Sequence, residues 1–417
     1  MPRGFAPGHA GRAHQEGQLR PMPSENTPQS STTKVPLWRL PVFRAAVFQI
    51  LLVLGILGFG YYLLNNTLYN MDQRGITTGF AFLSNEAGFG ILQSLIDYDE
   101  TYTYGRTFFV GLLNTLLVAV LGIFFATFIG FFVGIARLSH NWLVARLATV
   151  YIEIFRNIPL LLQIMFWYFA VLRPLPRPRQ SLNLGDAVFL NNRGLFLPGP
   201  VTEQGFWLVG AAFAVAIGLA IYVARWAHLR QEETGQQFPT FTAGLALIVG
   251  LPLLVFWLSG SPMHWEYPTL KGFNFSGGLE VIPELAALVL ALSIYTGAFI
   301  AEAVRSGIMA VTHGQTEAAH ALGLRPRVTL KLVVIPQAMR VIIPQLTSQY
   351  LNLTKNSSLA TAIGYPDLVS VFAGTTLNQT GQAVEVIAMT MGVYLAISLV
   401  ISMFMNWYNK RKQLVER

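Results

Sequence analysis

Several ionisable residues interrupt otherwise apolar segments of this sequence, and they are the first candidates for chemistry. Glu153 and Arg156 are three residues apart, as are Glu302 and Arg305, a spacing that brings side chains together on one face of a helix. Charged groups at membrane depth are costly and commonly mark a ligand path or a partner. Arg156, followed by Gln163, is therefore a candidate ligand-binding group. The alternative is a structural ion pair between Arg156 and Glu153, and we expect Glu302 and Arg305 to anchor a helix end.

A second polar run, QLTSQYLNLTKNSS at residues 345–358, lies in a segment otherwise suited to crossing a membrane. Gln345, Ser348, Asn352 and Lys355 recur at helical spacing and form one hydrophilic stripe. Polar side chains at membrane depth face protein or water rather than lipid. We interpret the stripe as lining a translocation path. The alternative is a set of interhelical hydrogen bonds that only fasten a bundle.

No catalytic constellation accompanies these residues. The chain has 0 cysteines, which excludes thiolate metal sites and cysteine nucleophiles. Its histidines lack the spacing of zinc hydrolases, and no Gly-x-Ser-x-Gly elbow occurs. No lysine follows a glycine, so the Gly-Lys-Ser/Thr core of a P-loop is missing. We expect no catalytic residue, metal site or cofactor, and any ATP must act through a separate subunit.

The elements that position these residues are membrane-spanning helices. Hydrophobic residues make up 53% of the chain and charged residues 12%, against about 25% charged residues in a soluble domain. The apolar runs approach the ~20 residues that a bilayer requires, and no alternating barrel pattern is present. We predict an all-α polytopic integral membrane protein. Its eight predicted spans are residues 43–64, 108–136, 147–172, 205–224, 241–259, 283–304, 339–361 and 384–408.

Lysine and arginine decide the orientation. With the N-terminus inside, these residues concentrate in the inner segments, which places both termini in the cytoplasm. The net charge of +8 is then a topology signal, and we expect no nucleic-acid partner. One outer loop departs from the rule, because RPLPRPRQ carries Arg173, Arg177 and Arg179. Either its charges meet an acidic partner, or it is a single exception to a statistical rule.

A polar segment, TEAAHALGLRPR at 316–327, lies between two predicted spans on the cytoplasmic side. Thr316 is expected to cap a helix whose first turn carries Glu317, and Gly323 is expected to end it in the left-handed conformation. Pro326 then starts a new helix. A small smooth face, open to close approach by another protein, is formed by Ala318, Ala319 and Leu322, with Glu317 at its edge. The alternative is an ordinary cytoplasmic loop helix.

These residues resemble the EAA loop of ABC importer permeases, which carries Glu-Ala-Ala, three residues, a glycine and a later Ile-Pro pair. Here they are Glu317-Ala318-Ala319, Gly323 and Ile335-Pro336. Three further stretches resemble the same family: TYGRTFFVGLLNTLLVAVLG at 103–122, RNIPLLLQ at 156–163 and KNSSLATAIGYPDL at 355–368. The sequence is similar to permeases for polar amino acids, in particular to the larger permease subunit of general L-amino-acid importers of Gram-negative bacteria.

The resemblance implies a type I ABC importer permease fold in the bacterial inner membrane, importing L-amino acids, of polar and broad specificity, from periplasm to cytoplasm. It implies four partners: an ABC ATPase subunit, a second permease subunit (homologous or identical), a periplasmic amino-acid-binding protein and membrane lipid. The ATPase-coupling residues it implies are Glu317, Ala318, Ala319, Leu322 and Gly323. The residues expected to line the substrate pathway are Arg156, Gln163, Gln345, Ser348, Asn352 and Lys355. The alternatives are an ion-coupled secondary transporter, a membrane enzyme, and a channel or sensor component.

The resemblance covers the permease domain at residues 107–408, with a coupling loop at 305–340. The family's minimal core has five spans, so the helix at 43–64 is an N-terminal addition and residues 173–282 are an insertion with two spans. The remaining segments are a disordered cytoplasmic tail at 1–42, a periplasmic segment at 65–106 and a cytoplasmic tail at 409–417.

Overall fold

The computed structural model describes residues 38, 41–73 and 78–412. The chain divides into two units, Met1–Gly75 and Ile76–Arg417. In the first unit, α1 (Pro41–Gln73) forms the predicted additional span and continues beyond its predicted end at residue 64. Most of the predicted tail at 1–42 lies outside the described residues, and so do residues 413–417.

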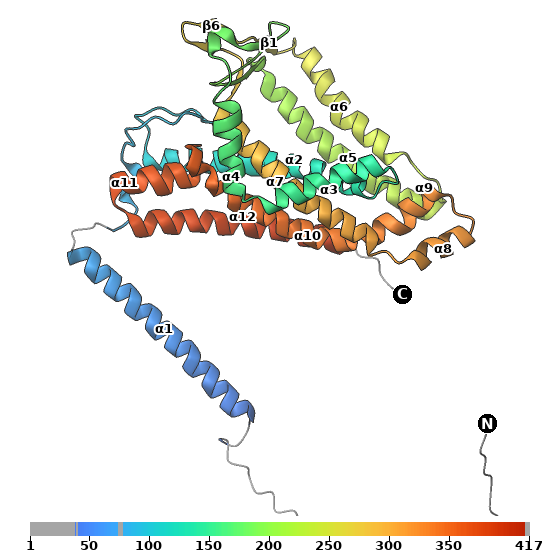
Figure 1. The fold of residues 1–417 in the computed structure, drawn as a ribbon, viewed down its shortest axis with the longest axis horizontal. Coiled ribbons are helices and arrows are strands. Elements are labelled where there is room, and N and C mark those ends of the chain that lie inside the picture. The colour runs from blue at the N-terminus through green and yellow to red at the C-terminus, as the bar shows by residue number, and fades with distance from the viewer. Residues whose placement is uncertain (1–37, 39–40, 74–77, 413–417) are drawn as a thin grey trace, which may run out of the picture. The chain divides into compact units, whose positions relative to one another are not determined.

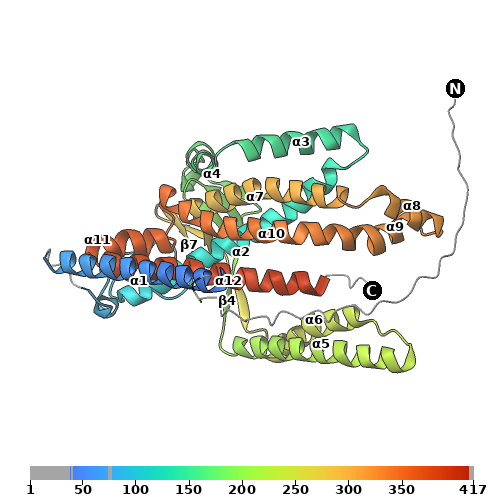
Figure 2. The ribbon, with the colours of Figure 1, turned by 90° about the horizontal axis from the view of Figure 1, so that it is seen from below.

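Four long helices form the centre of the second unit. They are α2 (Tyr104–Arg137), α7 (Pro283–Met309), α10 (Ile335–Asn356) and α12 (Ala383–Lys412), and they run alongside one another in Figures 1 and 2. Thr103 starts α2 because its side-chain oxygen accepts the backbone N–H of Arg106. The apolar core between these helices includes Leu288, Leu292 and Leu353, which are fully buried.

Glycines allow α2 and α7 to approach closely. A Cβ atom added at Gly134 would lie 2.7 Å from the carbonyl oxygen of Ala301, and one at Gly297 would lie 3.0 Å from Ile129. Small residues at such contacts let helix backbones pack tightly where lipid supplies no hydrophobic drive. This packing holds α7 as the most buried span of the chain's described part.

The third predicted span is broken. The α3 helix (Trp142–Asn157) ends before Pro159, and the chain restarts as α4 (Leu160–Met165) and the π-helical η3 (Phe166–Leu172) at an angle of 105°. Proline cannot donate the backbone hydrogen bond that would continue the helix. The predicted kink at Pro159 is therefore confirmed, and it divides the predicted span into two helical segments that run in different directions.

Shorter helical elements complete the second unit. Three of them, α8 (His313–Ala321), α9 (Pro326–Thr329) and η5 (Leu330–Val334), lie between α7 and α10. A continuous helical run from Pro326 to Ile363 replaces the shorter span predicted at 339–361. The others are η2 (Ala81–Ser84), η4 (Pro178–Gln180), η6 (Ser357–Ile363), η7 (Val369–Thr376) and α11 (Leu377–Thr380).

The insertion at 173–282 contains strands that the sequence analysis did not predict. The strands before its helices are β1 (Leu182–Leu184), β2 (Val188–Asn191), β3 (Gly194–Leu197) and β4 (Gly199–Thr202). Those after its helices are β5 (Met263–Glu266), β6 (Thr269–Lys271), β7 (Asn274–Ser276) and β8 (Leu279–Val281). They form one sheet in the order β1-β2-β3-β8 and two antiparallel pairs, β4-β5 and β6-β7. Phe275 stacks on Phe189 at 4.4 Å between ring centroids and packs against buried Phe196.

Two helices of the insertion form a hairpin beside the bundle. The α5 (Phe206–Thr234) and α6 (Thr240–Leu258) helices pack on each other and lie to one side of α7 and α10 in Figures 1 and 2. No residue of α6 is buried, as expected for a helix whose apolar side chains face lipid.

Within the described residues, seven helices are long and apolar enough to cross a membrane, or eight when the bent α3–α4–η3 pair is one span. The predicted helical fold with about eight spans is confirmed, and the short strands are its one departure.

Candidate functional site: the coupling segment, a polar stripe and an ion-pair network

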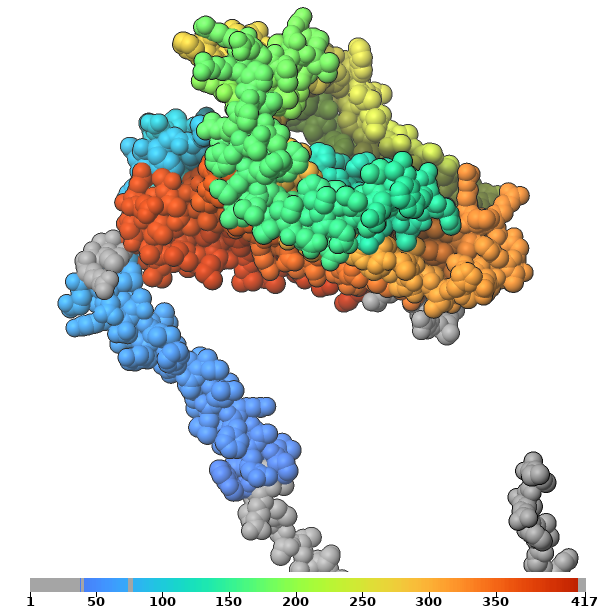
Figure 3. Space-filling model, viewed as in Figure 1, coloured from blue at the N-terminus to red at the C-terminus, as the bar shows by residue number. Residues whose placement is uncertain are grey.

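The segment between α7 and α10 folds as a short exposed helix. The α8 helix begins at His313, four residues before the predicted start at Glu317, and Thr312 occupies the N-cap position. Thr316 is inside the helix, where its hydroxyl donates to the carbonyl of His313, so the prediction that Thr316 caps the helix is wrong. Glu317 lies one turn in and accepts a contact from His313 Nδ1 at 2.9 Å. The orange segment around residue 320 lies at one end of the second unit, away from the green strands, in Figure 3.

The end of α8 is built as predicted. Gly323 has φ +75°, and its N–H donates to the carbonyl of His320 at 2.9 Å. The N–H of Leu324 donates to the carbonyl of Ala319 at 3.1 Å. These two bonds are the Schellman arrangement, in which a left-handed glycine satisfies the last carbonyls of a helix. Pro326 then opens α9 at its first turn, also as predicted.

The predicted smooth face of α8 is only partly exposed. Ala318 and Glu317 are exposed and Leu322 is 81% exposed, but Ala319 is 4% exposed. The expectation that Ala319 shares the outer face is wrong, because successive side chains of a helix point about 100° apart, and here Ala318 faces outward while Ala319 is buried. A link from Gln337 to Gln315 at 3.4 Å ties α8 to α10. Leu322 is thus an apolar side chain held in the open between two spans.

The polar stripe of α10 is exposed on this single chain. The four predicted residues, Gln345, Ser348, Asn352 and Lys355, all lie on the exposed face of the helix, whereas Leu353 on the opposite face is fully buried. Polar side chains at membrane depth need protein or water beside them. The stripe therefore needs a covering surface that this chain does not provide in its described residues.

Cysteine substitution tests whether water reaches this stripe. Since the chain has 0 cysteines, Asn352→Cys and Ser348→Cys each introduce a single thiol. We expect both to react with a charged, membrane-impermeant thiol reagent when the protein sits in its membrane. Leu346→Cys and Leu353→Cys, at buried positions of the same helix, are the controls and are expected to react at least ~10-fold more slowly. Equal protection of all four thiols would contradict a water-lined path.

A cavity of about 520 Å³ opens beside the end of this stripe. Lys355 and Ser358 lie on one side, and α12 contributes Thr390, Tyr394 and Ser398 on the other. These α12 residues were not among the predicted site residues, although their i, i+4, i+8 spacing places them on one helix face. The cavity places the ammonium group of Lys355 beside hydroxyl groups and the apolar side chains of Val369, Met391 and Leu395.

The other two predicted pathway residues lie elsewhere. Arg156 is exposed on α3, with its guanidinium 5.1 Å from the ring centroid of Phe299. Gln163 is buried, and its Nε2 donates to the carbonyls of Phe155 at 3.0 Å and Ile158 at 2.9 Å. These carbonyls lie at the break made by Pro159, so Gln163 stabilises the bend between α3 and α4. Its role as a pathway residue stays a prediction that this geometry does not favour.

An ion-pair network joins α2 to α7. Glu302 pairs with Arg305 at 2.5 Å on its own helix and with Arg137 at the end of α2. The predicted Glu302–Arg305 pair is therefore confirmed, and Arg137 is the partner that sequence spacing did not reveal. The expected pair of Glu153 and Arg156 does not form within 4.0 Å among the described residues, since the carboxylate of Glu153 lies 4.0 Å from Arg137 instead.

We expect Glu302→Gln to destabilise the protein by about 2 kcal/mol, because it leaves two partly buried guanidinium groups without their shared carboxylate. The measurement is the apparent unfolding temperature of the purified protein in detergent. Glu153→Gln is the matched control, since its carboxylate is 59% exposed and its contact with Arg137 is long; it is expected to change stability by at most ~0.5 kcal/mol. Equal unfolding temperatures for the two variants would contradict the network.

A buried polar cluster fixes the loop after η6 against α2. Asp367 is fully buried, and its Oδ1 accepts the N–H of Ser370 at 2.8 Å, which caps η7. The hydroxyl of Thr115 accepts the N–H of Leu368 at 3.0 Å, and Asn114 donates to the carbonyl of Pro366 at 2.9 Å. Burial raises the pKa of Asp367 to about 7. This loop lies in the stretch 355–368 that carried part of the family resemblance.

The described residues hold no group of three or more His, Cys, Asp or Glu side chains that could bind a metal ion. What they do hold is a set of apolar spans with an exposed polar stripe, a cavity at the end of this stripe and a capped helix presented outside the bundle. Together these features define an integral membrane permease.

The chain belongs to the family described as binding-protein-dependent transport system inner membrane component, whose model matches residues 126–414. It is 60% identical over 377 residues to YhdX of Escherichia coli (strain K12), named for amino-acid ABC transport, covering 90% of this chain and 96% of that protein. It is 55% identical over 377 residues to the general L-amino acid transport system permease protein AapQ of Rhizobium johnstonii, covering 90% and 94%. It is 44% identical over 406 residues to the glutamate/glutamine/aspartate/asparagine transport system permease protein BztB of Rhodobacter capsulatus, covering 90% and 95%. The resemblance to ABC importer permeases is confirmed.

Proposed function

We propose that this chain is the translocation subunit of an ATP-driven ABC importer that carries L-amino acids from the periplasm to the cytoplasm across the bacterial inner membrane. The observation that carries the proposal is the exposed, glycine-capped α8 between α7 and α10, joined to a set of spans with an exposed polar stripe. Two relatives that match over 90% of the chain are named for L-amino-acid or glutamate-class transport, which supports the substrate class.

The coupling role is assigned to the exposed side chains of α8 and its cap. Glu317, Ala318, Leu322 and Gly323 form the surface that contacts a separate ATPase subunit, while Ala319 supports this surface from within. The chain itself has no Gly-Lys-Ser/Thr sequence to cradle nucleotide phosphates. It therefore acts without an ATPase site of its own, and both termini lie with α8 in the cytoplasm.

The exposed stripe on α10 supports a paired assembly. A second permease subunit, homologous or identical, covers Gln345, Ser348, Asn352 and Lys355, so that the two chains enclose a polar path. Lys355 at the cavity of about 520 Å³ is the residue that attracts the carboxylate of the amino acid. A periplasmic binding protein delivers the amino acid to the outer end.

Transport by the reconstituted complex tests the proposal. The chain is placed in proteoliposomes with its second permease and ATPase subunits, and uptake of labelled L-glutamate and L-glutamine is measured with binding protein present. We expect uptake only with both ATP and binding protein. Uptake driven by an imposed proton or sodium gradient without ATP would instead establish an ion-coupled secondary transporter. Lys355→Ala is expected to reduce uptake, and Lys410→Ala, another exposed lysine that lies outside the cavity and the coupling loop, is the matched control.

A further inference from the structure

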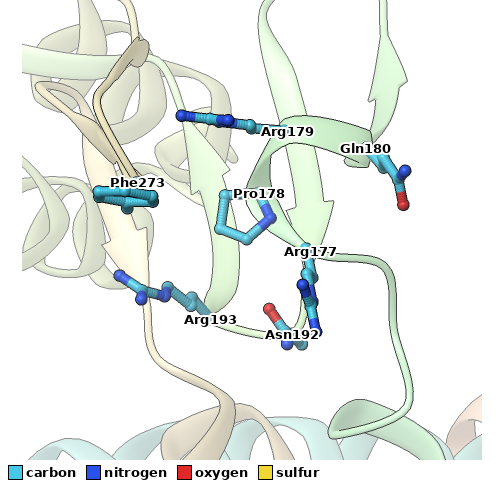
Figure 4. Close-up of a pocket in the computed structure, with 7 residues that line it drawn as sticks. All are labelled: Arg177, Pro178, Arg179, Gln180, Asn192, Arg193 and Phe273. Carbon is cyan, nitrogen blue, oxygen red and sulfur yellow. The ribbon is translucent and has the colours of Figure 1, made fainter.

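The insertion carries a pocket lined by three arginines. Arg177 and Arg179 come from η4 and its flanking residue, and Arg193 comes from the turn between β2 and β3 (Figure 4). Asn192 and Phe273 complete the lining, and the cavity has a volume of about 460 Å³. We call this the arginine pocket. It contains two of the three arginines that depart from the expected charge distribution of outer loops.

Short backbone bonds hold the pocket's two walls in place. The N–H of Asn192 donates to the carbonyl of Pro176 at 3.0 Å, which fastens the β2–β3 turn to the segment before η4. The N–H of Arg193 donates to Oδ1 of Asn191 at 2.8 Å, and Pro178, which also lines the pocket, is buried. The arginine side chains therefore project from a fixed base, which limits the entropy lost when they bind.

The guanidinium groups of the pocket have no carboxylate partner. Among the described residues, none of the three lies within 4.0 Å of a carboxylate, and Arg179 only stacks over the ring of Phe273 at 5.2 Å. The charge of Arg193 is close enough to Glu280 on β8 to interact with it electrostatically. Oδ1 of Asn192 is buried and has no hydrogen-bond donor among the described residues. The pocket thus offers guanidinium donors that have no carboxylate within 4.0 Å and one amide oxygen that accepts no hydrogen bond among the described residues.

The arginine pocket and the coupling segment lie at opposite ends of α7. The strands of the insertion end at β8, immediately before Pro283 starts α7, and α8 follows the other end of that helix. A helix of 27 residues is about 40 Å long, enough to cross the hydrocarbon core. If α8 meets an ATPase in the cytoplasm, as proposed above, the pocket faces the periplasm.

We infer that the arginine pocket is a docking site for an acidic surface of the soluble periplasmic binding protein, which presents several Asp or Glu carboxylates to Arg177, Arg179 and Arg193 together. The family description itself makes transport depend on such a protein. Guanidinium groups bind carboxylates through paired hydrogen bonds. The inference rests on the proposed function, because only an importer has this partner.

The exposure of the arginines favours a protein surface over a free anion. All three side chains are exposed to solvent, and a single carboxylate gains little from a hydrated, exposed cation. Several carboxylates held on one rigid surface engage the three cations at once, so that the later contacts form at high effective concentration. Such docking is sensitive to salt and mainly sets the rate of association.

Binding of the purified binding protein to the complete transporter tests the inference. The transporter, with wild-type or Arg177→Gln/Arg179→Gln/Arg193→Gln permease, is placed in nanodiscs of neutral phosphatidylcholine, and affinity is measured by biolayer interferometry at low and high salt. We expect the triple variant to bind at least ~10-fold more weakly at low salt and to lose most of the salt dependence. The variant with lysine at all three positions is expected to recover part of the affinity. Arg173→Gln, an exposed arginine of the same loop outside the pocket, is the matched control and is expected to bind within twofold of wild type.

Two further measurements separate the inference from its rivals. Saturable binding of free L-glutamate or succinate to the wild-type transporter, lost in the triple variant while binding-protein affinity stays unchanged, would show a small-anion site and overturn the docking. An unchanged affinity in neutral nanodiscs, with a defect only in phosphatidylglycerol nanodiscs, would assign the pocket to lipid headgroups. If the transporter with wild-type permease shows no ATP-dependent uptake, the proposed function is wrong. If the triple variant shows normal uptake and normal affinity for the binding protein, only the docking site is refuted.

Discussion

Replacing Gly323 with valine is expected to lower ATP-driven amino-acid uptake by about tenfold while the spans remain folded. Gly323 has φ +75° and ends α8. A branched side chain at this backbone angle is strained, and left-handed geometry costs roughly 1–2 kcal/mol per non-glycine residue. A free-energy difference of about 1.4 kcal/mol changes an equilibrium constant tenfold. Strain of this size at the helix cap therefore displaces Leu322 and Glu317 from their docked positions in most molecules.

Gly314→Val provides a matched control for this experiment. Gly314 lies in the same short helix, and a Cβ atom there meets nothing within 4 Å, as is also true at Gly323. Of these two glycines, only Gly323 has a positive φ. The measurements are ATP-dependent uptake in proteoliposomes, co-purification of the ATPase subunit, and gel filtration to confirm folding. If Gly323→Val transported as well as Gly314→Val, the capped helix would not be the coupling element.

The second large effect concerns Asp367, which is fully buried and has no cationic partner within 4.0 Å in the described part of the chain. Burial raises its pKa from 3.8 to about 7. The unfolded chain therefore releases this proton near pH 4 and the folded chain near pH 7, so the folded protein binds more protons between these values. Stability falls as pH rises through this window and levels off above it, by as much as ~4 kcal/mol.

Asp367→Asn and Asp367→Ala separate the charge from the cap. The asparagine variant keeps an oxygen for the N–H of Ser370 and cannot ionise, so its unfolding temperature is expected to equal or exceed that of the wild type at pH 8. The alanine variant loses the cap, which costs about 1 kcal/mol, and leaves that N–H buried. Thermal unfolding at pH 5 and pH 8 in the same detergent checks both. A wild-type protein whose stability relative to Asp367→Asn does not change with pH would contradict the buried charge.

The spans and the coupling segment were accessible from sequence because each depends on local signals. Apolar runs of membrane length define helices without reference to their neighbours, and a glycine followed by Pro326 marks a helix end through backbone geometry alone. The stripe at Gln345, Ser348, Asn352 and Lys355 followed from helical periodicity, and the structure exposes all four.

The features that sequence did not reveal depend on contacts between distant segments. Arg137 meets Glu302 across 165 positions of the chain, a pairing that no local spacing encodes. The burial of Ala319 depends on how α8 packs against the neighbouring α9 and η5, a tertiary contact that helical spacing alone does not encode. The strands of the insertion are three or four residues long, too short for an alternating pattern to be distinguished from a loop.

The sheet of the insertion has a consequence for how this chain could have arisen. Strand β3 precedes the α5–α6 hairpin and β8 follows it, yet they pair directly, with Leu195 opposite Val281. The hairpin therefore leaves and rejoins the polypeptide at adjacent points, in the manner of a cassette spliced into a surface loop. Such an addition leaves the rest of the fold unchanged, because an inserted segment is tolerated best when its two ends lie close together and do not force the flanking residues apart. The same property offers a site for exchange: the α5–α6 hairpin between Thr202 and Met263, which lie opposite each other in the β4–β5 pair, is the segment to replace by a short linker or a foreign domain, because this leaves Phe275 packed against Phe189 and Phe196.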